Sequence, residues 1–246
     1  MELGLRGRTA IVCGASSGMG LAIAEVLAAE GANVAMFARR RDLLEREAER
    51  IGALAVRGDL TNPTHLQALV ERTIEAFGGL DVLVLNGGGP PRSRAVDVTP
   101  ESLEAAVDLM LTSSVRLVRL ALPHLQPSGH GRIVAITSSS VREPIPNLAL
   151  SNAVRPGLVG WLKTLAGELG PDGVTVNVIS PGYVANTEFF GGRMSIERHD
   201  RLVAGTLVGR AGEPDDIAAA VRWLVGPGGG YVTGQVIAVN GGAVLG

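Results

Sequence analysis

A glycine-rich turn follows the first apolar segment of the chain, in the order Gly-Ala-Ser-Ser-Gly-Met-Gly. Glycines permit a tight turn and let the backbone approach a pyrophosphate closely, and a helix that begins there supplies N–H donors and a favourable dipole. A turn that is simply rich in glycine would look similar, but its place between a strand and a helix favours the dinucleotide interpretation. The cofactor ligands predicted here are Gly14, Ser16, Ser17, Gly18, Met19 and Gly20.

An arginine run, Arg39-Arg40-Arg41, follows the second apolar segment. In doubly wound folds an acid at this place accepts hydrogen bonds from the adenosine ribose of NAD, whereas here the position is Ala38. The guanidinium fork pairs well with two oxygens of a 2′-phosphate. The alternative interpretation is a solvated helix start. The run predicts that Arg39 and Arg40 bind NADP(H) in preference to NAD(H), which remains possible.

Two further loops follow the third and fourth apolar segments, where cofactor-binding loops gather at the carboxyl ends of parallel strands. Asp59 is predicted to meet the adenine amino group and Leu60 to cover the ring, although a plain Asx-turn would look much the same. The next loop adds three more predicted cofactor residues, Asn86, Gly87 and Gly88.

Short apolar runs alternate with longer helical patterns along the whole chain, which indicates right-handed βαβ units. We predict an α/β fold: a doubly wound, mainly parallel, seven-stranded sheet with helices on both faces, Rossmann-like, in a single domain spanning 1–246. Residues 100–125 read as one long helix, and 181–205 as a substrate-side flap without a clear period. The expected strands are 9–13, 33–37, 53–57, 81–85, 132–137, 174–179 and 235–239.

Composition excludes several classes of function. The formal net charge of −2 leaves no basic surplus for a nucleic-acid partner. Cys13 is the only cysteine, so an intrachain disulfide is impossible, and no spacing of histidines or acids suggests a metal. No signal peptide and no apolar run of about 20 residues is visible, so we expect no membrane partner and a cytoplasmic protein.

Motifs along nearly the whole chain resemble those of the short-chain dehydrogenase/reductase family, above all its acyl-carrier-protein ketoreductase-like members. The glycine turn resembles the family's TGxxxGxG, with Cys13 in place of threonine, and Leu85-Asn86-Gly87-Gly88 resembles a degraded NNAG. The resemblance implies that Pro181 and Gly182 also contact the cofactor. It further implies a homo-oligomer, usually a tetramer. The remaining matches are Asp59-Leu60-Thr61, Gly131-Arg132-Ile133-Val134, Ser138, Gly209-Arg210, Tyr231-Val232-Thr233-Gly234-Gln235 and Asn240-Gly241-Gly242.

The catalytic pattern departs from the family's. The family places a Tyr-x-x-x-Lys pair on the helix after the serine strand, where the resemblance puts Ser151 and Arg155. Ser138 matches the catalytic serine, and Met110 stands where the family has an asparagine. Arginine stays protonated at neutral pH and a serine hydroxyl is a poor acid, so the proton relay must differ. We predict Ser138, Ser151 and Arg155 as the catalytic set, with Arg155 also reaching the cofactor ribose or an anionic substrate group.

Three functions are compatible with this pattern. The first is an NADP(H)-dependent oxidoreductase that acts on a carbonyl or secondary alcohol of a small molecule through an atypical active site. The second is an NADP(H)-binding regulatory or non-catalytic homologue, and the third a non-redox lyase or isomerase. Tyr183 is a candidate replacement acid, although packing on the flap explains it equally well.

Overall fold

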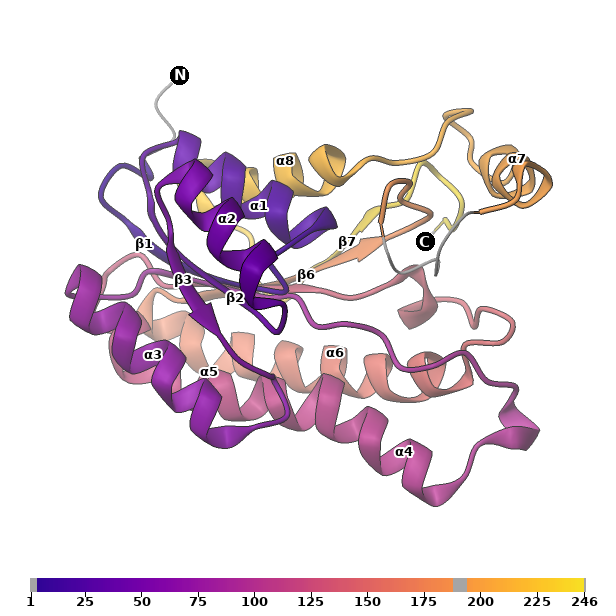
Figure 1. The fold of residues 1–246 in the computed structure, drawn as a ribbon, viewed down its shortest axis with the longest axis horizontal. Coiled ribbons are helices and arrows are strands. Elements are labelled where there is room, and N and C mark those ends of the chain that lie inside the picture. The colour runs from indigo at the N-terminus through magenta and orange to yellow at the C-terminus, as the bar shows by residue number, and fades with distance from the viewer. Residues whose placement is uncertain (1–3, 188–193, 246) are drawn as a thin grey trace.

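The computed structural model describes residues 4–187 and 194–245, and its centre is one parallel sheet in the order β3-β2-β1-β4-β5-β6-β7 (Figure 1). The chain winds outward from β1 in one direction and from β4 in the other. β1 and β4 therefore flank the topological switch point, where ligands bind at the carboxyl ends of the strands. The strands are β1 Thr9–Cys13, β2 Asn33–Ala38, β3 Leu54–Arg57, β4 Val82–Leu85, β5 Arg132–Ile136, β6 Thr175–Pro181 and β7 Val236–Val239.

Helices cover both faces of the sheet, so the predicted fold class is confirmed, with every paired strand parallel rather than most of them. Figure 1 shows α1, α2 and α8 on one side and α3, α5 and α6 on the other. The helices are α1 Gly18–Ala29, α2 Arg41–Ile51, α3 Pro63–Phe77, α4 Pro100–Val107, α5 Ser113–Leu125, α6 Ala149–Leu169, α7 Ile196–Ala204 and α8 Pro214–Val225.

The strands are apolar throughout because both of their faces are buried. Ile11 and Val12 are adjacent in β1 but enter different hydrophobic clusters, since successive side chains point to opposite faces. Ile11 packs in the cluster beneath α3, α5 and α6, and Val12 in the cluster beneath α1 and α8. These two layers hold the strand ends, and the loops on them, at fixed positions.

The predicted long helical stretch over 100–125 is present, but it is not α-helical throughout. A π-helical turn at Asp108–Thr112 separates α4 from α5. The hydroxyls of Ser113 and Ser114 donate to the carbonyls of Leu109 and Met110 at 2.6 and 2.9 Å. Such hydroxyl-to-carbonyl bonds four residues back loosen the helical ladder, and π turns recur at functional sites.

The proposed flap at 181–205 is not structureless in its described part. Pro181 is the last residue of β6, and helix α7 occupies Ile196–Ala204, which the sequence did not indicate. Val184 forms an isolated parallel bridge with Gly212, which holds the start of this segment against the body. Residues 188–193 of the predicted flap lie outside the described residues.

Candidate functional site

The glycine turn joins β1 to α1 at the switch point. Gly14 and Gly18 have positive φ angles of 61° and 56°, which favour glycine. Ser17 is the N-cap residue of α1, but its side chain accepts no hydrogen bond from the first helical turn. The N–H groups of that turn are therefore available to an anionic group.

Gly20 is required by close packing of α1 on the turn. A Cβ at this position would lie 2.2 Å from the carbonyl oxygen of Gly14 and 2.7 Å from Nδ2 of Asn86. We expect Gly20→Ala to destabilise the protein by about 2 kcal/mol, because backbone must move, and to weaken cofactor binding at least about tenfold by opening the turn. Chemical denaturation and cofactor titration measure the two effects. Gly160→Ala, on α6 with open space around it, is the matched control, and equal behaviour of the two variants would contradict this role.

Arginines gather beside the turn, at the ends of β2 and β3. Nη2 of Arg40 donates to the hydroxyls of Ser16 and Ser17 at 3.2 and 2.7 Å, which joins two predicted groups of ligands. Next to them is the Arg39 cavity, with a volume of about 360 Å³. It is lined by Arg39, Arg57, Gly58, Asp59 and His65.

The sequence prediction missed Arg57 and His65 in this cavity. Arg57 pairs with Ala38 in the sheet register, so its position at the end of β3 was the available signal. Asp59 forms the Asx-turn that the sequence left open: its Oδ1 accepts from the Thr61 amide at 2.9 Å. That bond lowers the pKa of Asp59, with a smaller contribution from Arg39.

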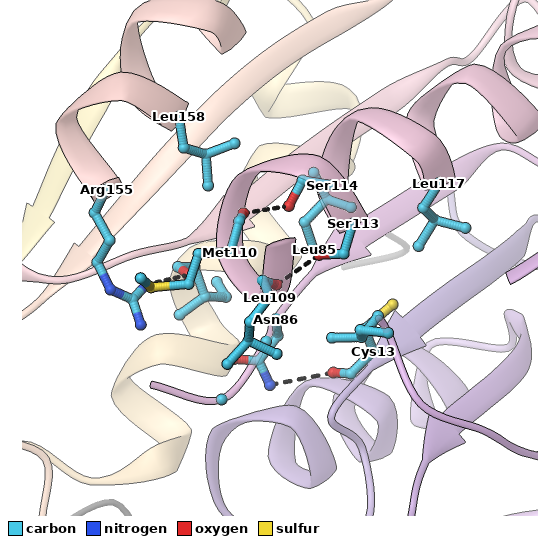
Figure 2. Close-up of a pocket in the computed structure, with 14 residues that line it drawn as sticks. Cys13, Leu85, Asn86, Leu109, Met110, Ser113, Ser114, Leu117, Arg155 and Leu158 are labelled. Carbon is cyan, nitrogen blue, oxygen red and sulfur yellow. Dashed lines mark hydrogen bonds between the residues drawn. The ribbon is translucent and has the colours of Figure 1, made fainter. Parts of the chain in front are cut away.

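A second cavity, the Arg155 cavity, lies between the ends of β1, β4 and β5 and helices α5 and α6 (Figure 2). Asn86 closes one side by donating from Nδ2 to the Cys13 carbonyl at 3.1 Å. The Cys13 thiol is fully buried, which raises its pKa to about 12 and makes it chemically inert. The lining residues are Cys13, Leu60, Leu85, Asn86, Gly87, Gly88, Leu109, Met110, Ser113, Ser114, Leu117, Ile136, Arg155 and Leu158.

Arg155 brings the predicted catalytic residues together. Its Nε donates to Ser151 Oγ at 3.0 Å, one helical turn earlier on α6, and its Nη1 donates to the Ile136 carbonyl at 3.4 Å. Ser151 Oγ lies 3.3 Å from Ser140 Oγ. Ser138 Oγ in turn accepts from the Ser140 amide at 3.1 Å. Ser140, which lies outside the predicted catalytic set, thus connects Ser138 to Ser151.

The guanidinium of Arg155 is a buried cation that has no counter-ion among the described residues. The residue is 7% exposed, and no carboxylate within the described ranges pairs with it. Burial lowers the pKa of this guanidinium to about 10, so it still carries its charge at neutral pH. An unpaired cation that points into a cavity attracts a negatively charged group.

The carboxyl end of β6 lies beside the Ser138 loop. The hydroxyl of Ser180 donates to the carbonyl of Ser138 at 2.9 Å, which ties the two strand ends together. Gly182 packs closely on Asn240, since a Cβ would lie 2.8 Å from the Asn240 Cα. Pro181 and Gly182 therefore stand at the same edge of the sheet as Ser138.

Comparison with known proteins is decisive for the family. Residues 14–244 match the family model described as enoyl-(acyl carrier protein) reductase. The chain is 32% identical to a 3-oxoacyl-(acyl-carrier-protein) reductase of Vibrio cholerae over 99% of this chain and 100% of that protein. This chain belongs to the short-chain dehydrogenase/reductase family.

Other short-chain dehydrogenases/reductases are similarly close. A 2,3-dihydroxy-2,3-dihydro-p-cumate dehydrogenase of Pseudomonas putida is 35% identical, over 99% of this chain and 96% of that protein. A dehydrogenase/reductase from Sinorhizobium meliloti superposes with a TM-score of 0.92 at 32% identity, covering 99% of this chain and 98% of that one. The L-sorbose reductase of Gluconobacter frateurii, solved with NADPH and L-sorbose, gives 0.92 at 28% identity with the same coverage.

In this short-chain dehydrogenase/reductase, Met110 lies at the π-helical turn and lines the Arg155 cavity. Figure 2 shows its thioether and the Arg155 guanidinium both pointing into that space. Within the described residues, the cavity lining holds no tyrosine, lysine, histidine or carboxylate. The described lining therefore offers a cation, while its two hydroxyls, of Ser113 and Ser114, donate to helix carbonyls, and it holds no group that exchanges a proton near neutral pH.

Tyr183, the candidate replacement acid, contacts the flap. Its hydroxyl is hydrogen-bonded to Nδ1 of His199 on α7 at 2.8 Å, and the two rings meet edge to face. It lines neither of the two cavities. These contacts favour the packing interpretation, in which Tyr183 connects the end of β6 to α7.

Further findings concern metals and membranes. Within residues 4–187 and 194–245, no cluster of histidine, cysteine and acidic side chains could hold a metal ion. In the same ranges, no helix combines the length and the apolarity that a membrane span requires.

Proposed function

We propose that this chain is an NADP(H)-dependent oxidoreductase that acts on a carbonyl or secondary alcohol, with Ser138, Ser151 and Arg155 as an atypical catalytic set. The observation that carries the proposal is the buried Arg155–Ser151–Ser140 chain beside the switch point. The glycine turn and the Arg39 cavity lie at the same edge of the sheet, as a dinucleotide spanning the switch point requires. The bound cofactor would supply the hydride, and the protein would position the reactants.

The arginines support a preference for NADP(H). Arg39 lines a cavity of sufficient size for a phosphorylated ribose, and Arg40 is held against the glycine turn by Ser16 and Ser17. Asp59 is engaged in its Asx-turn, and no acid takes the ribose-binding place at the end of β2. The solved L-sorbose reductase complex with NADPH agrees with this choice of cofactor.

Replacing Arg39 by alanine is expected to weaken NADPH binding about 10- to 100-fold, the usual effect of removing a charge-assisted hydrogen bond of about 1.5–3 kcal/mol. NADH affinity should stay within about twofold, because NADH lacks the phosphate. Fluorescence titration with both nucleotides measures the change, and Arg72→Ala, at an exposed position of α3, is the control. Wild-type protein that bound NADH as tightly as NADPH would refute the preference.

Turnover separates the proposal from its alternatives. NADPH oxidation is followed with purified protein and a panel of ketones, β-ketoesters and conjugated carbonyl compounds. Oxidation of NADPH by the wild-type protein that is lost in the Ser138→Ala variant would support the proposed oxidoreductase activity. Saturable NADPH binding without turnover of any substrate would instead favour the regulatory homologue, which the simultaneous departure of Ser151, Arg155 and Met110 from the family pattern makes the second candidate.

We also propose a homotetramer in the cytoplasm. β7 is an edge strand of the sheet, and Trp223 and Tyr231, which precede it in the chain, are exposed large apolar residues of the kind that a second chain would bury. Light scattering is expected to give about four times the chain mass of 25.4 kDa. A monomer at micromolar concentration would rule the tetramer out, and Trp223→Glu should shift wild-type tetramers toward smaller species.

A further inference from the structure

We propose that the Arg155 cavity binds a single small inorganic anion, of the charge and size of chloride, on the guanidinium of Arg155. The observation that carries this inference is a buried cation beside a hollow of about 20 Å³. The site is independent of the proposed oxidoreductase activity, because binding of the anion requires neither a cofactor nor turnover.

The first support is the hydrogen-bonding capacity that Arg155 leaves unused. A guanidinium carries five N–H donors. Nε donates to Ser151 Oγ and Nη1 donates to the Ile136 carbonyl, so three N–H groups have no partner among the described residues. Figure 2 shows the guanidinium pointing into the cavity. A monovalent anion there would supply both an acceptor for these donors and the opposite charge, at a place where burial strengthens the attraction.

The second support is the character of the other lining groups. The hydroxyls of Ser113 and Ser114 donate to helix carbonyls, and Nδ2 of Asn86 donates to the Cys13 carbonyl. The carbonyl oxygens that accept these bonds are therefore already engaged, and the described lining holds no carboxylate that would repel an anion. Its remaining side chains are apolar, mainly leucine. Because an apolar lining opposes any unpaired charge, an anion should bind only in direct contact with Arg155.

The size of the cavity selects the class of anion. Its volume of about 20 Å³ holds roughly one water molecule, for which about 10–15 Å³ is needed. Chloride is only slightly larger than water, whereas acetate, gluconate and phosphate are several times its size. A substrate carboxylate or a cofactor phosphate is therefore too large for this space, and we infer a halide as the ligand.

Urea unfolding at constant ionic strength tests the site in solution. Sodium gluconate is replaced stepwise by sodium chloride up to about 200 mM, where one site with a Kd of about 10 mM raises the folding equilibrium constant about 20-fold. We expect a rise of that size for the wild-type protein. Chloride-free buffer is the reference for every stability comparison at Arg155, because the cation is uncompensated there.

Two arginine variants show whether the response belongs to this cavity. Arg155→Met should remove the stabilisation by chloride, and Arg72→Met, which changes an exposed arginine of α3, should retain it. A wild-type protein equally stable in chloride and gluconate would overturn the inference, and so would an Arg155→Met protein that responds as the wild type does. Either result would leave the proposed function intact.

Anomalous scattering from bromide locates the ion without reference to stability. Crystals grown without halide are soaked in sodium bromide at about 100 mM, roughly ten times the expected Kd. We expect an anomalous peak in contact with the Arg155 guanidinium of the wild-type protein and none at this place in Arg155→Met. Peaks confined to the protein surface would show adventitious ions only and would overturn the assignment of the cavity as an anion site.

Discussion

Replacing Arg155 by methionine is expected to lower kcat by at least about 100-fold and, at the same time, to stabilise the folded protein. The loss of turnover follows from removing the cation that offsets the developing oxyanion. Removal of one oxyanion donor typically lowers kcat about 100- to 1000-fold. Because methionine is apolar and similar in length, the surrounding α6 and β5 contacts can persist.

The gain in stability follows from the burial of an unpaired charge. The pKa of Arg155 falls on folding to about 10, because burial disfavours the cation. A shift of this size corresponds to roughly 3 kcal/mol of opposition to folding. Since the folded-state pKa is the lower one, this opposition is complete below about pH 10 and fades between about pH 10 and 12.5. Two hydrogen bonds to Ser151 and Ile136 offset part of it, so a net gain of about 1 kcal/mol is expected.

Steady-state kinetics and denaturant unfolding of the same preparation measure both effects. Arg72→Met on the exposed surface of α3 removes one arginine without changing the site, and its unfolding free energy should stay within about 0.5 kcal/mol of wild type. An Arg155→Met protein that unfolds more easily and retains its turnover would show that Arg155 is a structural residue. A residue that lowers the free energy of unfolding but raises turnover is expected at a functional site, where activity and stability are in conflict.

The elements nearest the cofactor turn were predictable because local rules govern them. The glycine turn, the start of α3 at Pro63 and the alternation of apolar strands all depend on residues adjacent in sequence. The arginines after β2 were located for the same reason. The spacing of Ser151 and Arg155 placed them on one face of a helix, and the structure joins them by a hydrogen bond of 3.0 Å.

The remaining features depend on contacts between distant segments. Arg57 enters the Arg39 cavity only because β3 pairs with β2 in one register, which no local pattern specifies. Ser140 reaches Ser151 across a loop–helix contact. The π-helical turn at Asp108–Thr112 is accompanied by hydrogen bonds from two serine hydroxyls, and the apolar periodicity of the segment gives no sign of it. The burial of Arg155 away from every described carboxylate is likewise a property of the packed core.

Restoring the family's Tyr-x-x-x-Lys pair at positions 151 and 155 should give the site a proton donor for ketone reduction. In Ser151→Tyr/Arg155→Lys, a phenol would stand one helical turn from an ammonium group. Tyrosine titrates near about 10, and an adjacent cation lowers that pKa toward neutrality, so the oxygen of a reduced ketone would gain a proton donor. We expect acetoacetyl thioester turnover to rise about 100-fold or more, the range of general acid catalysis. Because lysine is smaller than arginine, the tyrosine ring at position 151 can occupy part of the space that the Arg155 guanidinium fills in the wild-type protein.

The matched control is Ser151→Phe/Arg155→Lys, which introduces the same ring and the same ammonium without the hydroxyl. Both double variants should lose similar stability, about 1–3 kcal/mol, because Ser151 is only 3% exposed and a ring must be accommodated. Only the tyrosine variant should gain ketone turnover, with a pH profile that falls as the phenol ionises. If the phenylalanine variant gained as much, the proton donor would be solvent, and the absence of tyrosine would not be what limits ketone reduction in the native site.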